Sequence, residues 1–366
     1  MRRLRIPSAV APLSLHCIDS AHFPRVADMR IGLLALLLFV CSVPAAAQMP
    51  PVGRIEISGH SRLVGNVRAL VTDLEGKPVP SDLEARLDSI AALPGVGEVS
   101  IDAVCCDGGF TTLYVAIREE GAPPIGFQEA PAGSVRLSPE IMKLGDRLDR
   151  ALEDAVRRGV AQEDHAEGHA LMADSAAQQV QREYMRVASS AESFLRDALA
   201  TSSDPSHRAL AAEILAYAPD KRSVVPSLLA AVRDPDPTVR NVAARALWII
   251  AAYAAEHTDR GISIAPEPFI DLLESVEWTD RNKAAMVLMQ LSATRDSALI
   301  SSLRARAFDT LVDMARWSNL GHAFPGVVVL GRTAGLSEEA IFAALSGGRK
   351  DTVIEAAIRS RRAGSP

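Results

Sequence analysis

The residues best suited to chemistry lie in one short segment, Glu163-Asp-His165-Ala-Glu167-Gly-His169. His165 and His169 are four residues apart, so on a helix they would share one face, as two metal ligands do. Glu167 would lie about 200° around such a helix from His165, too far to serve as a general base between the ligands. Two histidines without a third ligand rarely form a metal site. We therefore expect a solvated polar connector here, with an envelope metalloprotein or enzyme that uses His165 and His169 as the alternative.

Other catalytic motifs are missing from the sequence. It contains no G-x-S-x-G nucleophile elbow, no G-x-G-x-x-G motif and no Walker A motif. We therefore predict a protein that is not an enzyme and that needs no cofactor.

Composition and charge narrow the class of partner. Only 4% of the residues are aromatic, while alanine and leucine dominate, which favours packed helices. The net charge of the 366 residues is −6, and removal of residues 1–47 takes away five arginines and two aspartates, which leaves −9. Nucleic-acid binding requires a basic face that neutralises phosphates. We therefore expect a protein or peptide partner and no nucleic acid.

The first 47 residues are typical of an export signal. Residues 31–43 form an apolar run of 13 residues, and an A-x-A cleavage site ending at Ala47, with Gln48 after it, follows shortly. A membrane-spanning helix needs about 20 apolar residues, so we expect no retained membrane span. Met29, just before the run, would provide a conventional start and is the expected initiator. The sequence thus predicts export to the periplasm or cell envelope, or secretion.

Cys105 and Cys106 are the cysteines that remain after the leader. An oxidising compartment would favour a disulfide, but adjacent cysteines close only a strained ring. Two free thiols or pairing between chains are the alternatives. A redox or metal site would need C-x-x-C spacing or further ligands, so we interpret the pair as structural or incidental.

Residues 52–120 are predicted to form a small α+β domain. Residues 54–58 alternate polar and apolar side chains, as a half-buried strand does. Ser81-Asp-Leu-Glu84 is a capping box that would begin a helix. Two alternating runs then flank Asp107-Gly-Gly109, which predicts a β-hairpin. The order of strand, helix, turn and hairpin resembles a POTRA-type module, and this resemblance implies polypeptide handling by strand addition next to an outer-membrane machine.

Four predicted regions follow the small domain. Residues 121–136 are rich in proline and glycine and indicate a linker. Residues 137–203 are predicted to be helical, starting at Ser138 as N-cap, with further helices around 168–186 and 191–199, the last of them a solenoid cap. Residues 204–347 hold the repeats, and residues 348–366 hold a C-terminal helix and a frayed tail.

One helical motif, [Ser/Thr]-x-Arg-x-x-Ala-Ala-x-x-Leu, occurs three times. Its arginines are Arg208, Arg240 and Arg281, at spacings of 32 and 41 residues. Such self-similarity is typical of stacked helical repeats, with the Ala-Ala pair and Leu on the packing face and Ser or Thr as the cap. In the third copy Glu277-Trp-Thr replaces Asp-Pro-x-Pro, and Lys283 replaces an aliphatic residue. We expect that copy to be partly exposed or to bind a partner.

The repeats, and residues 232–247 above all, resemble the short HEAT repeats of phycobilisome lyases. The resemblance implies an α-solenoid in which an Asp before one helix and an Arg in its first turn hydrogen-bond along the stack. Asp234 and Arg240 would be such residues, with Arg208 and Arg281 at the equivalent positions. Iron hydroxylases with such repeats carry His-Glu dipeptides, and this chain has none.

The predicted fold is therefore mainly α, an α-solenoid of HEAT-like helical pairs preceded by a small α+β domain. The predicted function is an exported, non-enzymatic scaffold or adaptor that binds a protein or peptide. A POTRA-like accessory of an outer-membrane machine is a further alternative. Since stacking accounts for the Arg, Ala and Leu of the motif, the residues between them, which vary from copy to copy, should carry the specificity for the partner.

Overall fold

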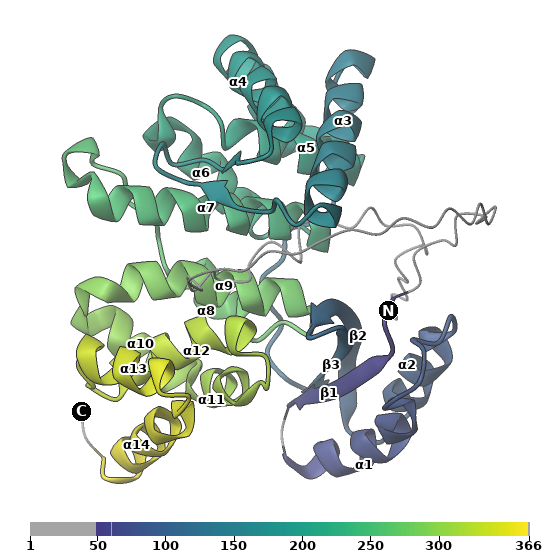
Figure 1. Cartoon of the computed structure of the whole chain (residues 1–366), viewed down its shortest axis with the longest axis vertical. Helices are drawn as coiled ribbons and strands as arrows, with labels where there is room; N and C mark the ends of the chain where they lie inside the picture. The colour runs from purple at the N-terminus through teal and green to yellow at the C-terminus, as the bar shows by residue number, and fades with distance from the viewer. Residues whose placement is uncertain (1–48, 60, 365–366) are drawn as a thin grey trace, which may run out of the picture.

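The computed structural model describes residues 49–59 and 61–364 and shows a small α+β domain followed by a helical solenoid (Figure 1). The predicted leader, with Met29 and the cleavage site at Ala47 and Gln48, lies outside the described residues. Within residues 49–59 and 61–364, no helix has the length and apolar character needed to cross a membrane.

The N-terminal domain has a three-stranded sheet in the order β1-β3-β2, in which β1 is parallel to β3 and β2 forms an antiparallel hairpin with β3. Its elements are β1 (Val52–Ser58), α1 (Ser61–Val71), the 3₁₀ helix η1 (Thr72–Leu74), α2 (Leu83–Ala91), β2 (Val96–Asp107) and β3 (Phe110–Glu119). The predicted capping box at Ser81 is wrong, because Asp82 is the N-cap of α2 and no side chain caps that helix. Helix α1 was not predicted, since only Leu63, Val67 and Val71 mark its buried face.

The helices of the solenoid follow from α3 onward. They are α3 (Pro139–Arg157), α4 (Ser175–Thr201), α5 (Pro205–Leu215), α6 (Lys221–Ala231), α7 (Pro237–Glu256), α8 (Glu267–Leu272), α9 (Trp278–Leu291), α10 (Ser297–Arg306), α11 (Phe308–Arg316), α12 (Leu320–Thr333), α13 (Glu338–Ser346) and α14 (Lys350–Arg362), with 3₁₀ turns η2 (Thr258–Arg260) and η3 (Ser292–Thr294). Ser138 caps α3 as predicted, accepting a hydrogen bond from the Ile141 amide. The two helices predicted within 168–199 are one helix, α4, which is kinked at Ala191.

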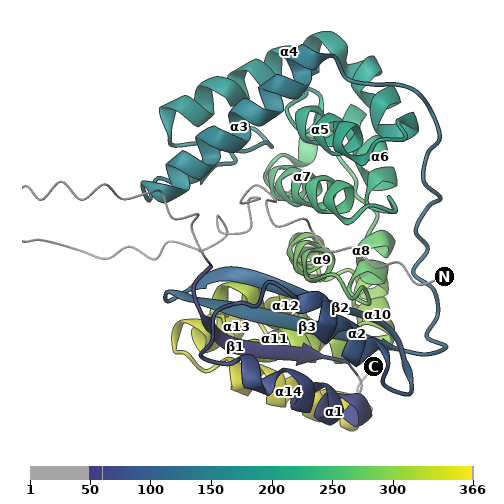
Figure 2. The same cartoon turned by 90° about the vertical axis from the view of Figure 1, so that its right-hand side faces the viewer.

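The repeat motifs lie on α5, α7 and α9, and these helices pack side by side in one layer that continues through α12 (Figure 2). In a second layer, α6 packs against α5 and α7, α8 packs against α9, and α11 packs against α12. The alanine pairs Ala211-Ala212, Ala243-Ala244 and Ala284-Ala285 are buried where the motif helices approach one another. Small side chains at these positions allow the close approach of neighbouring helices, which is why the motif repeats them.

The caps of the first two motif helices are aspartates rather than the predicted Ser and Thr, and the third motif helix has Glu277 at its N-cap with no capping hydrogen bond to that side chain. Asp204 and Asp236 are the N-caps of α5 and α7, and each accepts a hydrogen bond from the amide of Ser206 or Thr238, at 2.9 Å in both cases. A proline occupies the first helical position after each aspartate, and the cap therefore lies two residues upstream of the predicted Ser or Thr.

The third motif helix, α9, is buried rather than partly exposed. Lys283 is only 4% exposed, and Asp280, Arg281 and Asn282 are buried as well. Helix α9 packs against α7, α8 and α12, so it forms the centre of the molecule. The helix predicted within residues 348–366 is α14, which ends at Arg362 and packs on α11 and α12.

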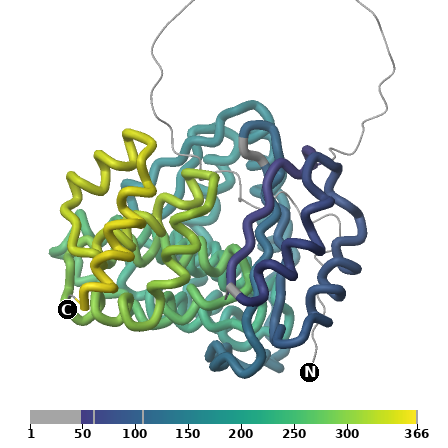
Figure 3. Tube along the Cα trace, turned by 90° about the horizontal axis from the view of Figure 1, so that it is seen from below, coloured from purple at the N-terminus to yellow at the C-terminus, as the bar shows by residue number. Residues whose placement is uncertain are grey.

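The N-terminal domain returns to the C-terminal end of the solenoid (Figures 1 and 3). Tyr114 of β3 lies between Trp278 and Trp317, with ring centroids 5.3 and 4.9 Å away. Its hydroxyl is 2.6 Å from Nδ1 of His322, and the Trp278 amide donates to Asp102 at 3.1 Å. Two of the three tryptophans thus bury their rings between the small domain and the repeats.

The linker runs along the edge of the solenoid from the small domain to α3 (Figure 2). The Gln128 amide donates to the carbonyl of Arg233 at 2.7 Å, and Phe127 packs over the guanidinium of Arg240, 4.1 Å from the ring centroid. Near its end, Gly133 forms a bridge with Ser202. The predicted spacer is therefore attached to the repeats along its length.

Candidate functional site

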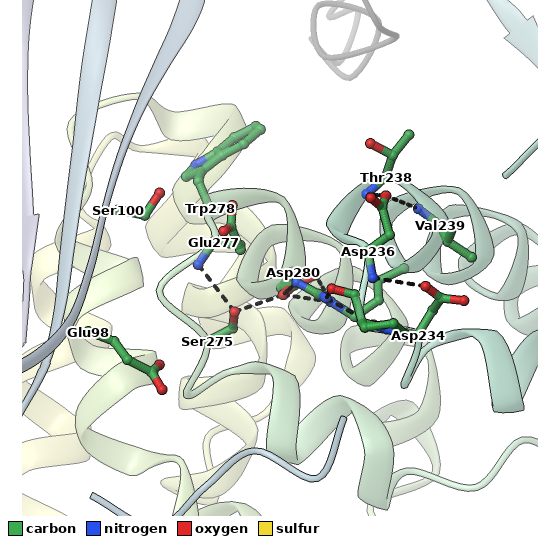
Figure 4. A network of polar contacts seen from close by, with 12 residues as sticks. Glu98, Ser100, Asp234, Asp236, Thr238, Val239, Ser275, Glu277, Trp278 and Asp280 are labelled. Atoms are coloured by element: carbon green, nitrogen blue, oxygen red, sulfur yellow. Dashed lines mark hydrogen bonds and ion pairs between the residues drawn. The ribbon is translucent and has the colours of Figure 1, made fainter. Parts of the chain in front are cut away.

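A buried ladder of Arg–Asp pairs sets the spacing of the motif helices. Arg208 donates through Nε and Nη2 to the two carboxylate oxygens of Asp234, at 2.7 Å each. The side chains are 2% and 6% exposed. Asp234 also accepts from the Asp236 amide at 2.8 Å, which fixes the turn before α7 (Figure 4). The pair thereby ties α5 to the start of the next repeat.

The next pair uses an acid that the motif did not identify. Arg240 donates to Asp280 through Nε and Nη2, at 3.0 and 2.7 Å, and Asp280 also accepts from the Ser275 hydroxyl at 2.7 Å (Figure 4). Asp280 lies inside α9, whereas Asp234 precedes its helix. The third copy therefore lacks the Asp-Pro-x-Pro sequence and still provides the carboxylate.

The ladder ends at Arg281, which is 4% exposed. Its Nε and Nη2 atoms have no hydrogen-bond partner within the described part of the chain, and burial lowers its pKa. Its guanidinium lies over the ring of Trp317, 5.8 Å from the centroid. Arg281 also lines a cavity of about 1240 Å³ between the small domain and the repeats. Arg208, Asp234 and Arg240 thus bond within the stack, and the four ladder residues do not gather at one binding site.

A second cavity, of about 350 Å³, lies on the face of the motif helices, and we call it the repeat cavity. Its walls come from α3, α5, α7 and the segment 163–170. Equivalent positions of the first two motif copies line it in pairs: Ser206 and Thr238, Ala209 and Asn241, Leu210 and Val242, Glu213 and Arg245, and Tyr217 and Ile249. Three of these pairs, Ala209 and Asn241, Leu210 and Val242, and Glu213 and Arg245, are variable positions of the motif, on which partner specificity was predicted to depend.

The segment 163–170 forms one wall of the repeat cavity and is not a solvated connector. Glu163 begins the short strand β4 (Glu163–Asp164), which pairs with β5 (Leu171–Met172). Its carboxylate accepts from Nη2 of Arg245 at 2.5 Å and lies 2.9 Å from Nε2 of His165. Burial raises the pKa of Glu163, but the charge of Arg245 and the bond to His165 more than offset it, so the pKa is lowered. Sequence alone could not show that Arg245, on a distant helix, provides the charge that allows this segment to be buried.

His165 and His169 bind different partners and do not act as a pair. His169 is 5% exposed, and its Nδ1 lies 3.0 Å from Nζ of Lys221. Burial and the charge of Lys221 lower the pKa of His169 to about 4, so the ring is neutral at pH 7. Because the Lys221 ammonium donates to Nδ1, the ring proton must be on Nε2. That Nε2 atom has no hydrogen-bond partner among the described residues.

Carboxyl groups occupy the other side of the repeat cavity. Glu213 accepts from the Tyr184 hydroxyl at 3.2 Å. Burial and the neighbouring charge of Asp149 raise the pKa of Glu213 to about 7. Burial also raises the pKa of Asp149, together with the charges of Asp146 and Glu153. The cavity thus combines aliphatic walls with carboxyl groups that are costly to ionise.

The remaining candidate residues lie elsewhere. Cys105 lies near the end of β2 and is disulfide-bonded, while the side chain of Cys106 falls outside what the structure describes. Within residues 49–59 and 61–364, no three His, Cys, Asp or Glu side chains are grouped as metal ligands would be.

Comparison with known proteins agrees with the repeat architecture. Residues 192–289 match the family model of HEAT repeats, which covers the three motif helices. A designed armadillo repeat protein in complex with the peptide (KR)4 is similar in structure, with 14% sequence identity and a TM-score of 0.34 over 60% of this chain and 99% of that chain. No curated protein matches the chain. Residues 192–289 of the solenoid are thus similar to HEAT repeats.

Proposed function

We propose that this protein is an exported, non-enzymatic scaffold or adaptor that binds a segment of a protein partner in the repeat cavity. The observation that carries this proposal is that equivalent variable positions of two successive repeats line one cavity. Solenoids commonly bind partners along such repeated surfaces, with the packing residues kept and the surface residues changed. Aliphatic walls with a few convergent polar groups are typical of binding pockets.

The small domain and linker support a scaffold of fixed shape. They attach to the solenoid through Tyr114, Asp102 and Phe127. The repeat cavity itself is lined by α3, α5, α7 and the segment 163–170, of which α5 packs against both α3 and α7. Binding would then require little ordering of the scaffold, which reduces the entropic cost of association.

The test is affinity capture from the compartment that the leader implies, with the mature chain and two variants. Ala209 lines the repeat cavity, so Ala209→Trp should fill it and abolish capture of the partner. Ala255→Trp places the same side chain at an exposed position near the end of α7 and should leave capture unchanged. Equal capture by wild type and Ala209→Trp would refute the site.

Export is tested separately. N-terminal sequencing of the protein from the envelope or medium should find Gln48 as the first residue. Recovery of the intact chain from the cytoplasm alone would refute this part of the proposal.

A further inference from the structure

The repeat cavity has more carboxyl groups than it has cations to pair with them. Four acids line it, Asp146, Asp149, Glu163 and Glu213, against one basic side chain, Arg245. Arg245 is already bonded to Glu163 at 2.5 and 2.7 Å. Within the described residues, the other three acids form no ion pair at salt-bridge distance. The cavity therefore has a surplus of negative charge at its polar side.

Burial and the neighbouring acids raise the pKa values of Glu213 and Asp149. The pKa of Glu213 is raised to about 7 by burial and by Asp149, and Arg245 lowers it only in part. An incoming cation would favour the ionised form of Glu213, since an opposite charge close by favours ionisation. The charged and titratable groups that face Glu213 are Asp146 and Asp149 from α3, Tyr184 from α4, Tyr217 after α5, Arg245 from α7, and Glu163, His165 and His169 from the segment 163–170.

The walls and the unpaired polar atoms indicate the shape of the ligand. Leu152, Val242 and Ile249 line the cavity, and such walls suit an alkyl stem that carries a charged head. Oδ1 of Asn241 is a buried acceptor without a donor, and Nε2 of His169 is a buried donor without an acceptor, within the described residues. A cationic head provides donors, whereas the acceptor for His169 must come from another group, such as a peptide carbonyl.

We propose that the repeat cavity binds a lysine or arginine side chain of an extended peptide segment of the partner, with Glu213 and Asp149 receiving the cationic head. This inference rests on the proposed function, because it specifies the chemistry of the segment that the scaffold binds. The stem packs on the aliphatic wall, Asn241 accepts from the head, and His169 donates to a backbone carbonyl of the same segment.

The experiment is an NMR titration of the mature chain with three small probes. Nα-acetyl-arginine N-methylamide carries the cation and the peptide carbonyls. Its citrulline counterpart has the same shape without charge, and n-butylguanidine has the charge without the peptide group. At pH 8 the arginine probe should bind at least tenfold more tightly than either of the others. Between pH 6 and pH 8 its affinity should rise by up to about tenfold, as Glu213 ionises.

Single substitutions test whether the carboxyl groups of the repeat cavity cause the preference for the arginine probe. Glu213→Gln and, independently, Asp149→Asn should each reduce the arginine preference several-fold, while Glu256→Gln, at an exposed position of α7, should not change it. Equal binding of the arginine and citrulline probes would overturn the cationic specificity while leaving the cavity as a peptide site. Binding of n-butylguanidine as tight as that of the arginine probe would overturn the claim that the cation belongs to a peptide segment. Failure of every probe to bind would overturn this inference, whereas the proposed function is refuted separately, by capture that Ala209→Trp does not affect.

Discussion

Replacement of Asp234 by alanine tests the ladder that holds the repeats together. Arg208 and Asp234 are almost wholly buried, at 2% and 6% exposure, and share two hydrogen bonds of 2.7 Å. Without Asp234 the guanidinium keeps only the carbonyl of Ser202, at 2.9 Å. Breaking a buried pair by removing one partner costs about 3–5 kcal/mol, because an uncompensated charge remains inside. We expect Asp234→Ala to lower the free energy of unfolding by about that amount.

The assay is guanidinium unfolding followed by circular dichroism, with two controls. Asp309 pairs with Arg361 at 2.5 Å, but its side chain is 83% exposed, so Asp309→Ala should cost less than about 1 kcal/mol. The double variant Arg208→Met, Asp234→Leu removes both charges and should recover much of the loss. A loss for Asp234→Ala no larger than for Asp309→Ala would refute the structural role of the ladder.

Two further predictions concern the cavity wall and the docking of the small domain. The pKa of His169 is about 4, below the ordinary 6.5, so the unfolded chain binds a proton that the folded chain does not. The folded state should therefore lose up to about 1.4 kcal/mol of stability per pH unit as the pH falls from 6.5 to 4, and His169→Gln should remove this part of the pH dependence in urea unfolding. Tyr114 is 1% exposed between Trp278 and Trp317, so Tyr114→Ala should cost about 3–5 kcal/mol and expose the linker to limited proteolysis, and unchanged cleavage would contradict the docking.

The repeats were predictable from sequence because stacking imposes the same residues on each copy. Arg208, Arg240 and Arg281 mark equivalent turns, and the alanine pairs mark equivalent packing positions. The motif could not show that Asp280 replaces the aspartate that the third copy lacks. A carboxylate can reach the arginine of the preceding repeat from a position before its own helix, as Asp234 does, or from inside the helix, as Asp280 does. The motif does not show which of these positions is used.

The site was predictable only in outline. Variable positions of the motif were expected to carry specificity, and three pairs of them line the repeat cavity. The segment 163–169 was expected to be solvated, because two histidines without a third ligand rarely form a metal site. Arg245 and Lys221 provide those partners from α7 and α6, through contacts between residues far apart in the chain.

Selection of displayed peptides on the mature chain directly tests whether the repeat cavity binds a peptide segment. We expect the enriched peptides to bind the wild type and Ala255→Trp. They should not bind Ala209→Trp, whose new side chain fills the repeat cavity. Enriched peptides that bind wild type and Ala209→Trp equally well would contradict it.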